Sequence, residues 1–473
     1  MIKKIIVALL IFSTLISSAM VSFAHNEEKL GNDSFIGETP GIQWSRQYGA
    51  KGPDHFNKVR KTADGGYLIV GDTKSYSPDG YYAAWLVKTD AFGYEEWNHT
   101  YSSYAVFGTE CQQTSDGGYA FCGVNNESCY WLVKTDAYGE EQWEKSFDDG
   151  TAWCFQQTTE GGYIIAGFPQ MFIRTDSQGN VLWKKTYFNS NNTFAYSIQQ
   201  TEDGGFIVTG KTDYYSHGDH VNGFLLKLDQ NGTKEWDKTF METENSVLQS
   251  VQQIPDNGYI AVGAIGAVYY SPWVVRTDQD GTELWNRTYN SIAEIAHEVI
   301  LTNDGGFALA GEDESGTSCI IKTISNGTKE WEFILVGYLT SLQQAADGSI
   351  IIAGVDESVD NLGNGILMKI GHVPSVEITK PTKAIYLFDQ KIRDFFTVIA
   401  LGRLTVEVNA SDIKYNIDRV EFAVDGTLKN TDIIAPYNWQ WTTLSFFSHT
   451  LTVTAYNAVG NCSKAQIRLF KIF

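Results

Sequence analysis

The chain is dominated by seven copies of one sequence unit, which run from Trp44 to about Gly371. Each copy reads roughly W-x-x-x-Y, a variable loop, Q-Q-T-x-D-G-G-Y-I-x-x-G, a second variable loop, and W-L-V-K-T-D-x-x-G. Repeats spaced 40 to 53 residues apart are typical of propeller blades or solenoid units. The repeated tryptophans are Trp44, Trp97, Trp143, Trp183, Trp236, Trp285 and Trp331. The turns that start with an acidic residue begin at Asp64, Asp116, Glu160, Asp203, Asp256, Asp304 and Asp347.

Within each copy, four short β-rich runs alternate with turn signals. In the third copy these runs are 154–158, 163–167, 172–175 and 181–187. Four antiparallel strands in a unit of this length indicate a propeller blade, and no sustained helical periodicity is present. The sequence therefore predicts an all-β fold with a seven-bladed β-propeller over residues 42–371.

The two ends of the repeat region predict how the ring closes. The last copy has three expected strands, at 342–345, 349–354 and 365–370, and no W-x-x-x-Y run follows them. The missing outer strand lies at the other end of the region, in residues 43–48. We expect this N-terminal strand to complete the seventh blade, because the pairing leaves no unpaired sheet edge.

The first 24 residues have the features of a secretory signal peptide. Two lysines are followed by an apolar run from Ile5 to Ile16 and by a cleavage site after Ala24. The alternative is an uncleaved anchor, because about 20 apolar residues can just span a bilayer. With cleavage, residues 25–41 form an N-terminal linker, no transmembrane segment remains, and the protein is expected to be secreted or at the cell surface.

The negative net charge limits the classes of partner and cofactor that the protein is expected to bind. The formal net charge of −21 argues against nucleic acid, because phosphate binding needs a basic surface. The sequence specifies no cofactor. The acidic Asp-x-x-Gly turns make calcium a candidate, although one turn offers only a few of the roughly six to eight oxygens that calcium takes.

Export would permit two covalent modifications. Cys111 and Cys122 flank the turn at Asp116 and form one candidate disulfide, and Cys129 and Cys154 form a second, with the connectivity left open. The candidate glycosylation sites are Asn98, Asn126, Asn191, Asn231, Asn286, Asn326 and Asn409.

Residues 372–473 lack the repeat and are expected to form a β-sandwich. Strand alternation marks 404–408, 420–424 and 450–456, and the segment carries the runs V-E-F-A-V-D-G and H-T-L-T-V-T-A-Y-N. This pattern resembles the immunoglobulin-like modules of secreted and cell-surface proteins of archaea and bacteria. The resemblance implies a spacer or attachment domain. Such modules usually carry Tyr-Asp-x-Ala-Gly-Asn near their end, where this chain has Asn457 in place of the aspartate.

The repeats have two resemblances of their own. They resemble the repeats of secreted archaeal and bacterial proteins with a Q-x-x-x-D-G-G-Y pattern. They are also loosely similar to the docking motif of quinoprotein dehydrogenases, as in the run from Asp278 to Trp285. Those enzymes typically have eight blades, whereas this chain has seven copies.

The long variable loops are predicted to gather on one face of the ring, because the short glycine turns occupy the other. Aromatic side chains in these loops suit stacking against sugar rings or packing against a protein partner. The candidate ligand-binding residues are Tyr76, Tyr81, Tyr82, Tyr214, Tyr215, Tyr269 and Tyr270. The best metal candidate is a single loop with three ligand types, His217, Asp219 and His220.

The innermost strand of each copy is expected to line the centre of the ring. Lys58, Glu110 and Glu298 fall at the same repeat position, and His297 precedes Glu298, so these residues are candidates for acid–base chemistry. Five copies carry a glutamine pair there, which we expect to satisfy backbone groups of the channel wall. The pairs are Gln112-Gln113, Gln156-Gln157, Gln199-Gln200, Gln252-Gln253 and Gln343-Gln344.

The sequence favours a non-catalytic extracellular binding or adhesion protein whose loop face binds a glycan or a surface protein. No nucleophile elbow, phosphate loop, His-Glu-x-x-His or Cys-x-x-Cys is present. Two alternatives stay open. One is a secreted propeller enzyme, either a polysaccharide lyase or hydrolase or a quinoprotein-like oxidoreductase. The other is a structural spacer of the cell envelope.

Overall fold

The computed structural model describes residues 40–472 apart from 78–79, 102–105, 189–191, 214–220, 241–244, 267–269, 290, 292, 314, 357–362, 413–414 and 459. Every regular element in this part of the chain is a β-strand. A search of the same residues for a helix long and apolar enough to cross a membrane finds none.

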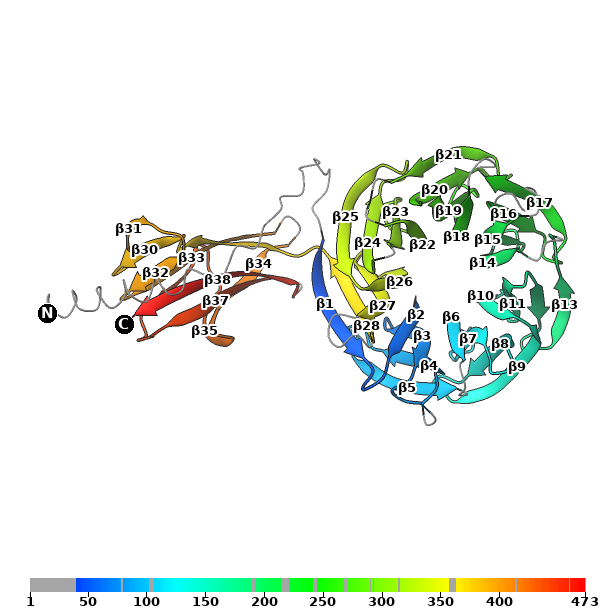
Figure 1. Ribbon diagram of the computed structural model, residues 1–473, viewed down its shortest axis with the longest axis horizontal. Coiled ribbons are helices and arrows are strands. Elements are labelled where there is room, and N and C mark those ends of the chain that lie inside the picture. The colour runs from blue at the N-terminus through cyan, green and yellow to red at the C-terminus, as the bar shows by residue number, and fades with distance from the viewer. Residues whose placement is uncertain are drawn as a thin grey trace. The chain divides into compact units, whose positions relative to one another are not determined.

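The repeat region forms seven four-stranded antiparallel sheets within the described residues. The sheets radiate from a common centre, as the blades of a propeller do (Figure 1). The strands nearest the centre are β2 (Asp54–Lys61), β6 (Phe107–Gln113), β10 (Thr151–Gln157), β14 (Phe194–Gln200), β18 (Ser246–Gln253), β22 (Ile295–Leu301) and β26 (Tyr338–Gln344). The second strands are β3 (Tyr67–Thr73), β7 (Tyr119–Val124), β11 (Tyr163–Phe168), β15 (Phe206–Thr212), β19 (Tyr259–Ile265), β23 (Phe307–Glu312) and β27 (Ile350–Asp356).

The outer half of each sheet follows the same order. The third strands are β4 (Ala83–Thr89), β8 (Cys129–Thr135), β12 (Phe172–Thr175), β16 (Asn222–Leu228), β20 (Ser271–Thr277), β24 (Thr317–Thr323) and β28 (Asn364–Gly371). The fourth strands are β5 (Glu95–Tyr101), β9 (Glu141–Asp149), β13 (Val181–Lys185), β17 (Lys234–Phe240), β21 (Glu283–Thr288), β25 (Lys329–Val336) and, in the last sheet, β1 (Gly41–Tyr48).

The first strand of the chain thus belongs to the last sheet, whose order is β1-β28-β27-β26. β1 runs antiparallel to β28, from Gly41 opposite Gly371 to Tyr48 opposite Gly365. On its other side this sheet adjoins the first one, where Thr340 donates a hydrogen bond to the carbonyl oxygen of Phe56 at 2.7 Å. The last sheet is therefore in direct contact with the first.

The tryptophan of the W-x-x-x-Y motif connects six of the seven sheets to the next one. The Trp97 ring packs so closely on Gly139 that a Cβ there would lie 2.7 Å from it. The hydroxyl of Tyr101 donates a hydrogen bond to the carbonyl oxygen of the same glycine. A bulky residue at Gly139 would clash, and its φ of +84° also favours glycine. The equivalent pairs are Trp44–Gly93, Trp97–Gly139, Trp143–Gly179, Trp183–Gly232, Trp236–Gly281 and Trp285–Gly327.

The acidic residue of each glycine turn has a structural role within its own sheet. Oδ1 of Asp64 accepts hydrogen bonds from the Thr62 hydroxyl and the Gly66 amide, and Oδ2 pairs with the buried Lys88 at 2.7 Å. These bonds close the turn and compensate the buried ammonium group. The seven pairs are Lys88–Asp64, Lys134–Asp116, Arg174–Glu160, Lys227–Asp203, Arg276–Asp256, Lys322–Asp304 and Lys369–Asp347.

Neither predicted disulfide is present in the structure, in which all six cysteines are free thiols. The register places Cys111 opposite Phe121 and Cys122 opposite Glu110. Neighbouring positions of a strand point to opposite faces of the sheet, so these two sulfur atoms face apart. The sulfur of Cys129 lies 3.7 Å from the Glu127 carbonyl oxygen, and that of Cys154 lies 3.6 Å from the Ala166 carbonyl oxygen.

The C-terminal residues form a sandwich of two sheets with its own core. The smaller sheet has the order β29 (Ser375–Lys380), β33 (Leu404–Ser411) and β36 (Tyr437–Trp441). The larger sheet has the order β31 (Gln390–Asp394), β30 (Ala384–Leu387), β32 (Val398–Leu401), β38 (Cys462–Ile472), β37 (Ser448–Asn457), β34 (Ile417–Val424) and β35 (Thr427–Asp432). Alternate side chains from both sheets are buried against one another, among them Val406, Phe422, Trp441 and Val453.

Candidate functional site

A β-bulge in each inner strand determines which side chains reach the centre of the ring. The register shifts by one residue near the start of all seven inner strands. A bulge re-aims the side chains beside it. The residues that follow the bulge are Lys58, Glu110, Cys154, Ser197, Ser250, Glu298 and Ser341. All except Ser341 line a central cavity of about 250 Å³, which we call the channel.

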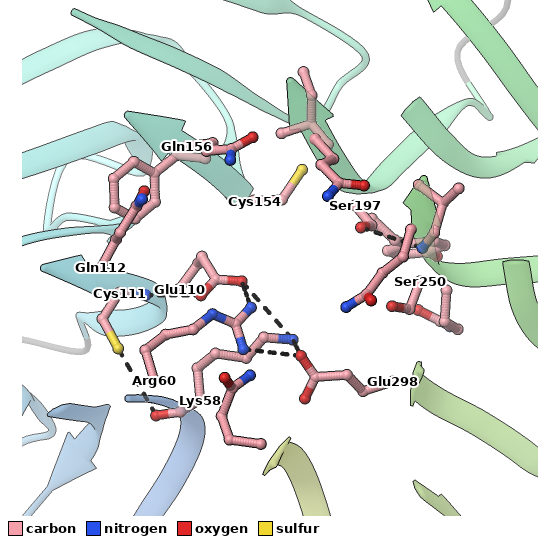
Figure 2. Close-up of a pocket in the computed structure, with 18 residues that line it drawn as sticks. Lys58, Arg60, Glu110, Cys111, Gln112, Cys154, Gln156, Ser197, Ser250 and Glu298 are labelled. Carbon is pink, nitrogen blue, oxygen red and sulfur yellow. Dashed lines mark hydrogen bonds and ion pairs between the residues drawn. The ribbon is translucent and has the colours of Figure 1, made fainter. Parts of the chain in front are cut away.

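Four charged side chains meet on one side of the channel. Arg60 contacts Glu110 at 2.7 Å and Glu298 at 2.9 Å, and Lys58 contacts the same carboxylates at 3.8 and 3.1 Å. Figure 2 shows the two cations between the two carboxylates. Three non-adjacent segments of the chain therefore converge here, and the four formal charges cancel.

The two carboxylates of this cluster titrate in opposite directions. Burial alone would raise the pKa of Glu298, but Lys58 and Arg60, with hydrogen bonds from the Ser341 hydroxyl and the Leu342 amide, lower it to about 2. The pKa of Glu110 is raised, because burial and the negative charge of Glu298 outweigh its cationic neighbours. The pKa of the Arg60 guanidinium is raised despite its burial, because both carboxylates favour its charged form.

This arrangement favours a structural role for the charge cluster. Glu298 is ionised at neutral pH and is held by two cations and two hydrogen bonds. His297 does not join it in an acid–base pair, because its Nε2 lies 3.0 Å from Glu312 on the neighbouring strand. Residues far apart in the sequence are tied together instead, from the first sheet to the sixth.

The glutamine pairs connect neighbouring sheets through their side-chain oxygens. Oε1 of Gln112 accepts a hydrogen bond from the Gln157 amide of the next sheet at 2.9 Å. Oε1 of Gln113 accepts one from the Ala63 amide of the preceding sheet at 2.7 Å. The same forward or backward bond recurs at Gln156, Gln157, Gln199, Gln200, Gln252, Gln253 and Gln344. The amides thus satisfy backbone groups, as the sequence analysis expected.

A second cavity, of about 520 Å³, opens at the start of the inner strands, on the face where the long loops lie. We call it the loop-face groove. It is lined by Asn57, Asp72, Phe107, Thr109, Val124, Thr151 and Trp153, from the first three sheets. The rings of Phe107 and Trp153 are 38% and 40% exposed, so two large aromatic surfaces face solvent in one hollow.

Polar groups lie at one end of the loop-face groove. Asp72 is only 3% exposed; its carboxylate contacts His55 Nδ1 at 3.0 Å and accepts a hydrogen bond from Asn57 Nδ2 at 3.1 Å. Asn57 Nδ2 also donates to the Gly108 carbonyl oxygen at 2.9 Å. These contacts hold an amide and a carboxylate beside the Phe107 ring.

Further aromatic rings extend this surface on both sides. Tyr82 lies with its ring centre 6.0 Å from that of Phe107. In the other direction, Trp153 is followed by Tyr196 at 6.4 Å, and Tyr196 by Phe194 at 5.9 Å. Burial raises the pKa of Tyr196 to about 12, so its hydroxyl stays neutral and able to donate.

The structure describes four of the seven predicted tyrosines, and these four lie in different surroundings. Tyr82 is next to the loop-face groove, whereas the Tyr76 ring packs on Trp85 at 5.5 Å and Tyr81 is exposed. Tyr270 is exposed on the fifth sheet, away from the groove. Tyr214, Tyr215 and Tyr269 lie outside the described residues.

The metal candidates His217, Asp219 and His220 also lie outside the described residues. Elsewhere in the described part of the chain, no three His, Cys, Asp or Glu side chains come close enough to hold a metal ion. The most acidic turn shows why: Oδ1 of Asp278 accepts hydrogen bonds from the backbone amides of Asp280 and Thr282.

The candidate glycosylation sites fall into two structural groups. Asn126, Asn231 and Asn326 are exposed in turns, and Asn409 is exposed on β33. Asn98 and Asn286 lie on outer strands, where each accepts a hydrogen bond from a tryptophan and donates one to a glutamate. Asn191 lies outside the described residues.

Arg60, Phe107 and Trp153 are not predicted from the sequence. Phe107 and Trp153 lie on strands rather than in variable loops, and only the bulge brings Trp153 to the surface. A signal was available for Arg60, because it stands where five other copies have the first glutamine of the pair. An arginine at that position marks where the channel becomes charged.

Several solved structures have a fold similar to the ring of sheets. The WD40 beta propeller domain of Doa1 aligns with a TM-score of 0.49 and 15% identity over 70% of this chain and 97% of that domain. The structure of U3-55K aligns with a TM-score of 0.51 and 8% identity over 70% of this chain and all of that one. At these identities the similarity concerns the fold alone.

The extracellular domain of a protein described as a one-component system of B. thetaiotaomicron also aligns, with a TM-score of 0.43 and 10% identity. The alignment covers 90% of this chain, which spans 59% of the length of that domain. No protein of curated function matches the chain in sequence. Residues 374–453, within the C-terminal sandwich, match the family described as Bacterial Ig domain.

Proposed function

We propose that this protein is a non-catalytic extracellular binding protein whose loop-face groove binds a glycan. One observation carries the proposal: the exposed rings of Phe107 and Trp153 share a groove with a carboxylate and an amide. Sugar rings present an apolar C–H face and a rim of hydroxyls. The aromatic rings would take the first by stacking, and Asp72 and Asn57 would take the second by hydrogen bonding.

The scaffold of this proposal is a closed seven-bladed propeller over residues 42–371, followed by an immunoglobulin-like domain over residues 372–473. The pairing of β1 with β28 and the packing of Trp44 on Gly93 of the first sheet support the closure. A closed ring presents its loops on a rigid frame, which lowers the entropy lost on binding. The C-terminal domain would then act as a spacer or attachment module.

An extracellular location is part of the proposal. The apolar run near the N-terminus has the pattern of a secretory leader, which we expect to be removed after Ala24. The Bacterial Ig domain match in residues 374–453 and the acidic composition are compatible with a protein outside the cell. A surface protein could take the place of the glycan as partner, because exposed aromatic residues also act as anchors in protein interfaces.

Binding without catalysis is favoured by the state of the charged groups. The carboxylates of the channel are engaged by Lys58 and Arg60. Asp72 in the groove is engaged by His55 and Asn57. A general acid or base must be within reach of the proton that it transfers to or from a substrate, and these contacts occupy the carboxylates with protein groups instead.

The test is a glycan array probed with residues 25–473, followed by affinity measurements on the best glycan. The double variant Phe107→Ala/Trp153→Ala is expected to lose about 2 kcal/mol or more of binding free energy, roughly a thirtyfold weaker Kd. Tyr138→Ala is the matched control, because that ring is exposed on the face of the short glycine turns. Unchanged binding by the double variant would contradict the placement, and release of sugar would show an enzyme.

A further inference from the structure

The channel contains a set of amide groups whose orientation is fixed by the fold. Gln112, Gln156, Gln199 and Gln252 each line the channel, and each accepts a backbone hydrogen bond from the next sheet through Oε1. The distances are 2.9, 2.5, 2.7 and 3.2 Å in that order. A backbone N–H can only donate, so the oxygen of each amide must face the backbone. The NH₂ group of each glutamine is therefore the end that remains available to the channel.

These four Nε2 atoms have no hydrogen-bond partner among the residues that the structure describes. Two nearby serine hydroxyls can also donate a hydrogen bond into the channel. Oγ of Ser197 accepts from the Val251 amide at 3.4 Å, and Oγ of Ser250 accepts from the Val299 amide at 3.3 Å. Each hydroxyl accepts one bond from the backbone and keeps an O–H to donate. This part of the wall therefore presents mainly donors; Gln343, which also lines the channel, is an exception, because its Nε2 donates to the carbonyl oxygen of the preceding residue.

We propose that the channel binds a small oxyanion, such as a carboxylate, sulfate or phosphate, through the amide ring of Gln112, Gln156, Gln199 and Gln252. A ligand that satisfies several donors at once must carry several acceptors, and an oxyanion does so. The neighbouring charge cluster does not oppose it, because Lys58 and Arg60 offset Glu110 and Glu298. The cavity of about 250 Å³ has room for such an ion with bound water.

The proposed anion site is separate from the loop-face groove and does not depend on glycan binding. Neutral sugars fit the channel less well, because their hydroxyls donate as well as accept and would find few acceptors there. Metal cations are disfavoured for the same reason: the amide oxygens that would ligate them are already used. The backbone contacts engage the oxygen of each amide and leave its NH₂ group to donate. The proposed ligand is therefore an anion.

The experiment compares anions at constant ionic strength. Sodium sulfate, phosphate, acetate and chloride are titrated into the protein, and heat of binding and melting temperature are recorded. We expect a saturable rise in melting temperature and measurable heat for at least one oxyanion, and none for chloride. A dependence that is the same for all four salts would overturn the proposal, as would the absence of any heat.

Two double variants distinguish binding by the four channel amides from a general effect of added negative charge. Gln156→Glu/Gln199→Glu keeps an oxygen for each backbone N–H but removes both donors, and is expected to weaken binding at least tenfold. Gln157→Glu/Gln200→Glu adds the same charge beside the channel, because these side chains bond to Ser115 and Thr159 and do not line it. The control is expected to retain binding to within a fewfold.

Equal weakening in both double variants would show long-range repulsion and overturn the assignment to the ring. Folding of each variant is checked by its melting curve without added anion. If the first double variant does not fold, the single variant Gln156→Glu is compared with Gln157→Glu in the same titration. The relative response to acetate, sulfate and phosphate then identifies whether planar or tetrahedral oxyanions are preferred.

Discussion

The hydroxyl of Tyr48 donates a hydrogen bond to the carbonyl oxygen of Gly93, and the ring of Trp44, four residues earlier, packs on the Cα of the same glycine. The two aromatic residues lie on β1 in the last sheet, and the glycine lies in the first sheet. The packing of Trp44 on Gly93 repeats, between the two ends of the repeat region, the Trp–Gly packing of five interior junctions. Three of those junctions, at Tyr101, Tyr187 and Tyr289, also have the tyrosine hydrogen bond.

Replacement of Gly93 tests this junction. In Gly93→Ala, the new Cβ would lie 2.6 Å from the Trp44 ring at a φ of +75°. We expect a loss of about 3 kcal/mol in the free energy of unfolding, from the clash and the backbone strain together. Gly65→Ala is the control, because Gly65 has a φ of +86° with nothing within 4 Å of its Cβ position. It should cost only about 1 kcal/mol. Equal losses in urea unfolding would contradict the contact.

The stability of the charge cluster should depend on pH through Glu298. Its pKa of about 2 in the folded protein lies below the ordinary value of 4.5. A carboxylate with a lowered folded pKa stabilises the fold above its unfolded pKa, and this contribution is lost as the pH falls from about 4.5 towards 2. Glu298→Gln should cost about 3 kcal/mol at pH 7, because it removes a buried charge partner of two half-buried cations. The difference from wild type in urea unfolding should shrink as the pH falls through that window.

Glu110→Gln is the matched comparison for Glu298→Gln. The pKa of Glu110 is raised in the folded protein, so the fold favours its protonated form relative to the unfolded chain. A neutral glutamine resembles that form, and the variant should lose less stability at pH 7 than Glu298→Gln. A larger loss in Glu110→Gln would show that the two carboxylates have been assigned the wrong way round.

The burial of the free cysteines predicts how fast their thiols react. Burial raises the pKa of the Cys111, Cys122 and Cys154 thiols, and raised pKa values and lack of access both slow alkylation. Cys462 is half-buried and should react first in the native protein. Mass spectrometry after denaturation in N-ethylmaleimide, without reductant, should find all six thiols modified. Fewer adducts would indicate that a disulfide forms after all.

Glycosylation should follow side-chain availability. The amides of Asn126 and Asn231 are exposed in turns, whereas that of Asn98 is held between the Trp85 indole and Glu95. If the exported protein is glycosylated, peptide mapping should find sugar at Asn126 and Asn231 before Asn98. Sugar at Asn98 with Asn126 unmodified would argue against this order.

The repeat made the architecture of the sheets predictable from the sequence. It did not predict which residues of neighbouring copies contact one another. The motifs W-x-x-x-Y and T-D-x-x-G locate strands and turns, yet nothing in them tells that Trp97 meets Gly139 of the following copy. Such pairings need the spacing of the sheets in space. The placement of Lys58 and Glu110 at one repeat position was readable, because equivalent residues of a repeat occupy equivalent places.

The candidate site was harder to predict because β-bulges change which face a residue occupies. The bulge between Ala152 and Cys154 turns Trp153 towards the loop-face groove, in a strand where simple alternation would have been assumed. The register, which the sequence does not reveal, also separates Cys111 from Cys122, since one residue of offset moves a side chain to the opposite face. The sequence predicts aromatic residues of the loops as the site, whereas the strand residues Phe107 and Trp153 line the groove.

The antiparallel pairing of β1 with β28 has a mechanical consequence. Gly41 lies opposite Gly371, so the chain enters and leaves the ring of sheets at neighbouring points. A tension applied between the N-terminal segment and the C-terminal domain would act on this end of the β1–β28 pair and separate its hydrogen bonds one after another. The applied force would not pass through the other six sheets. Resistance to stretching would then be set by one strand, while the loop-face groove keeps its shape until that strand detaches.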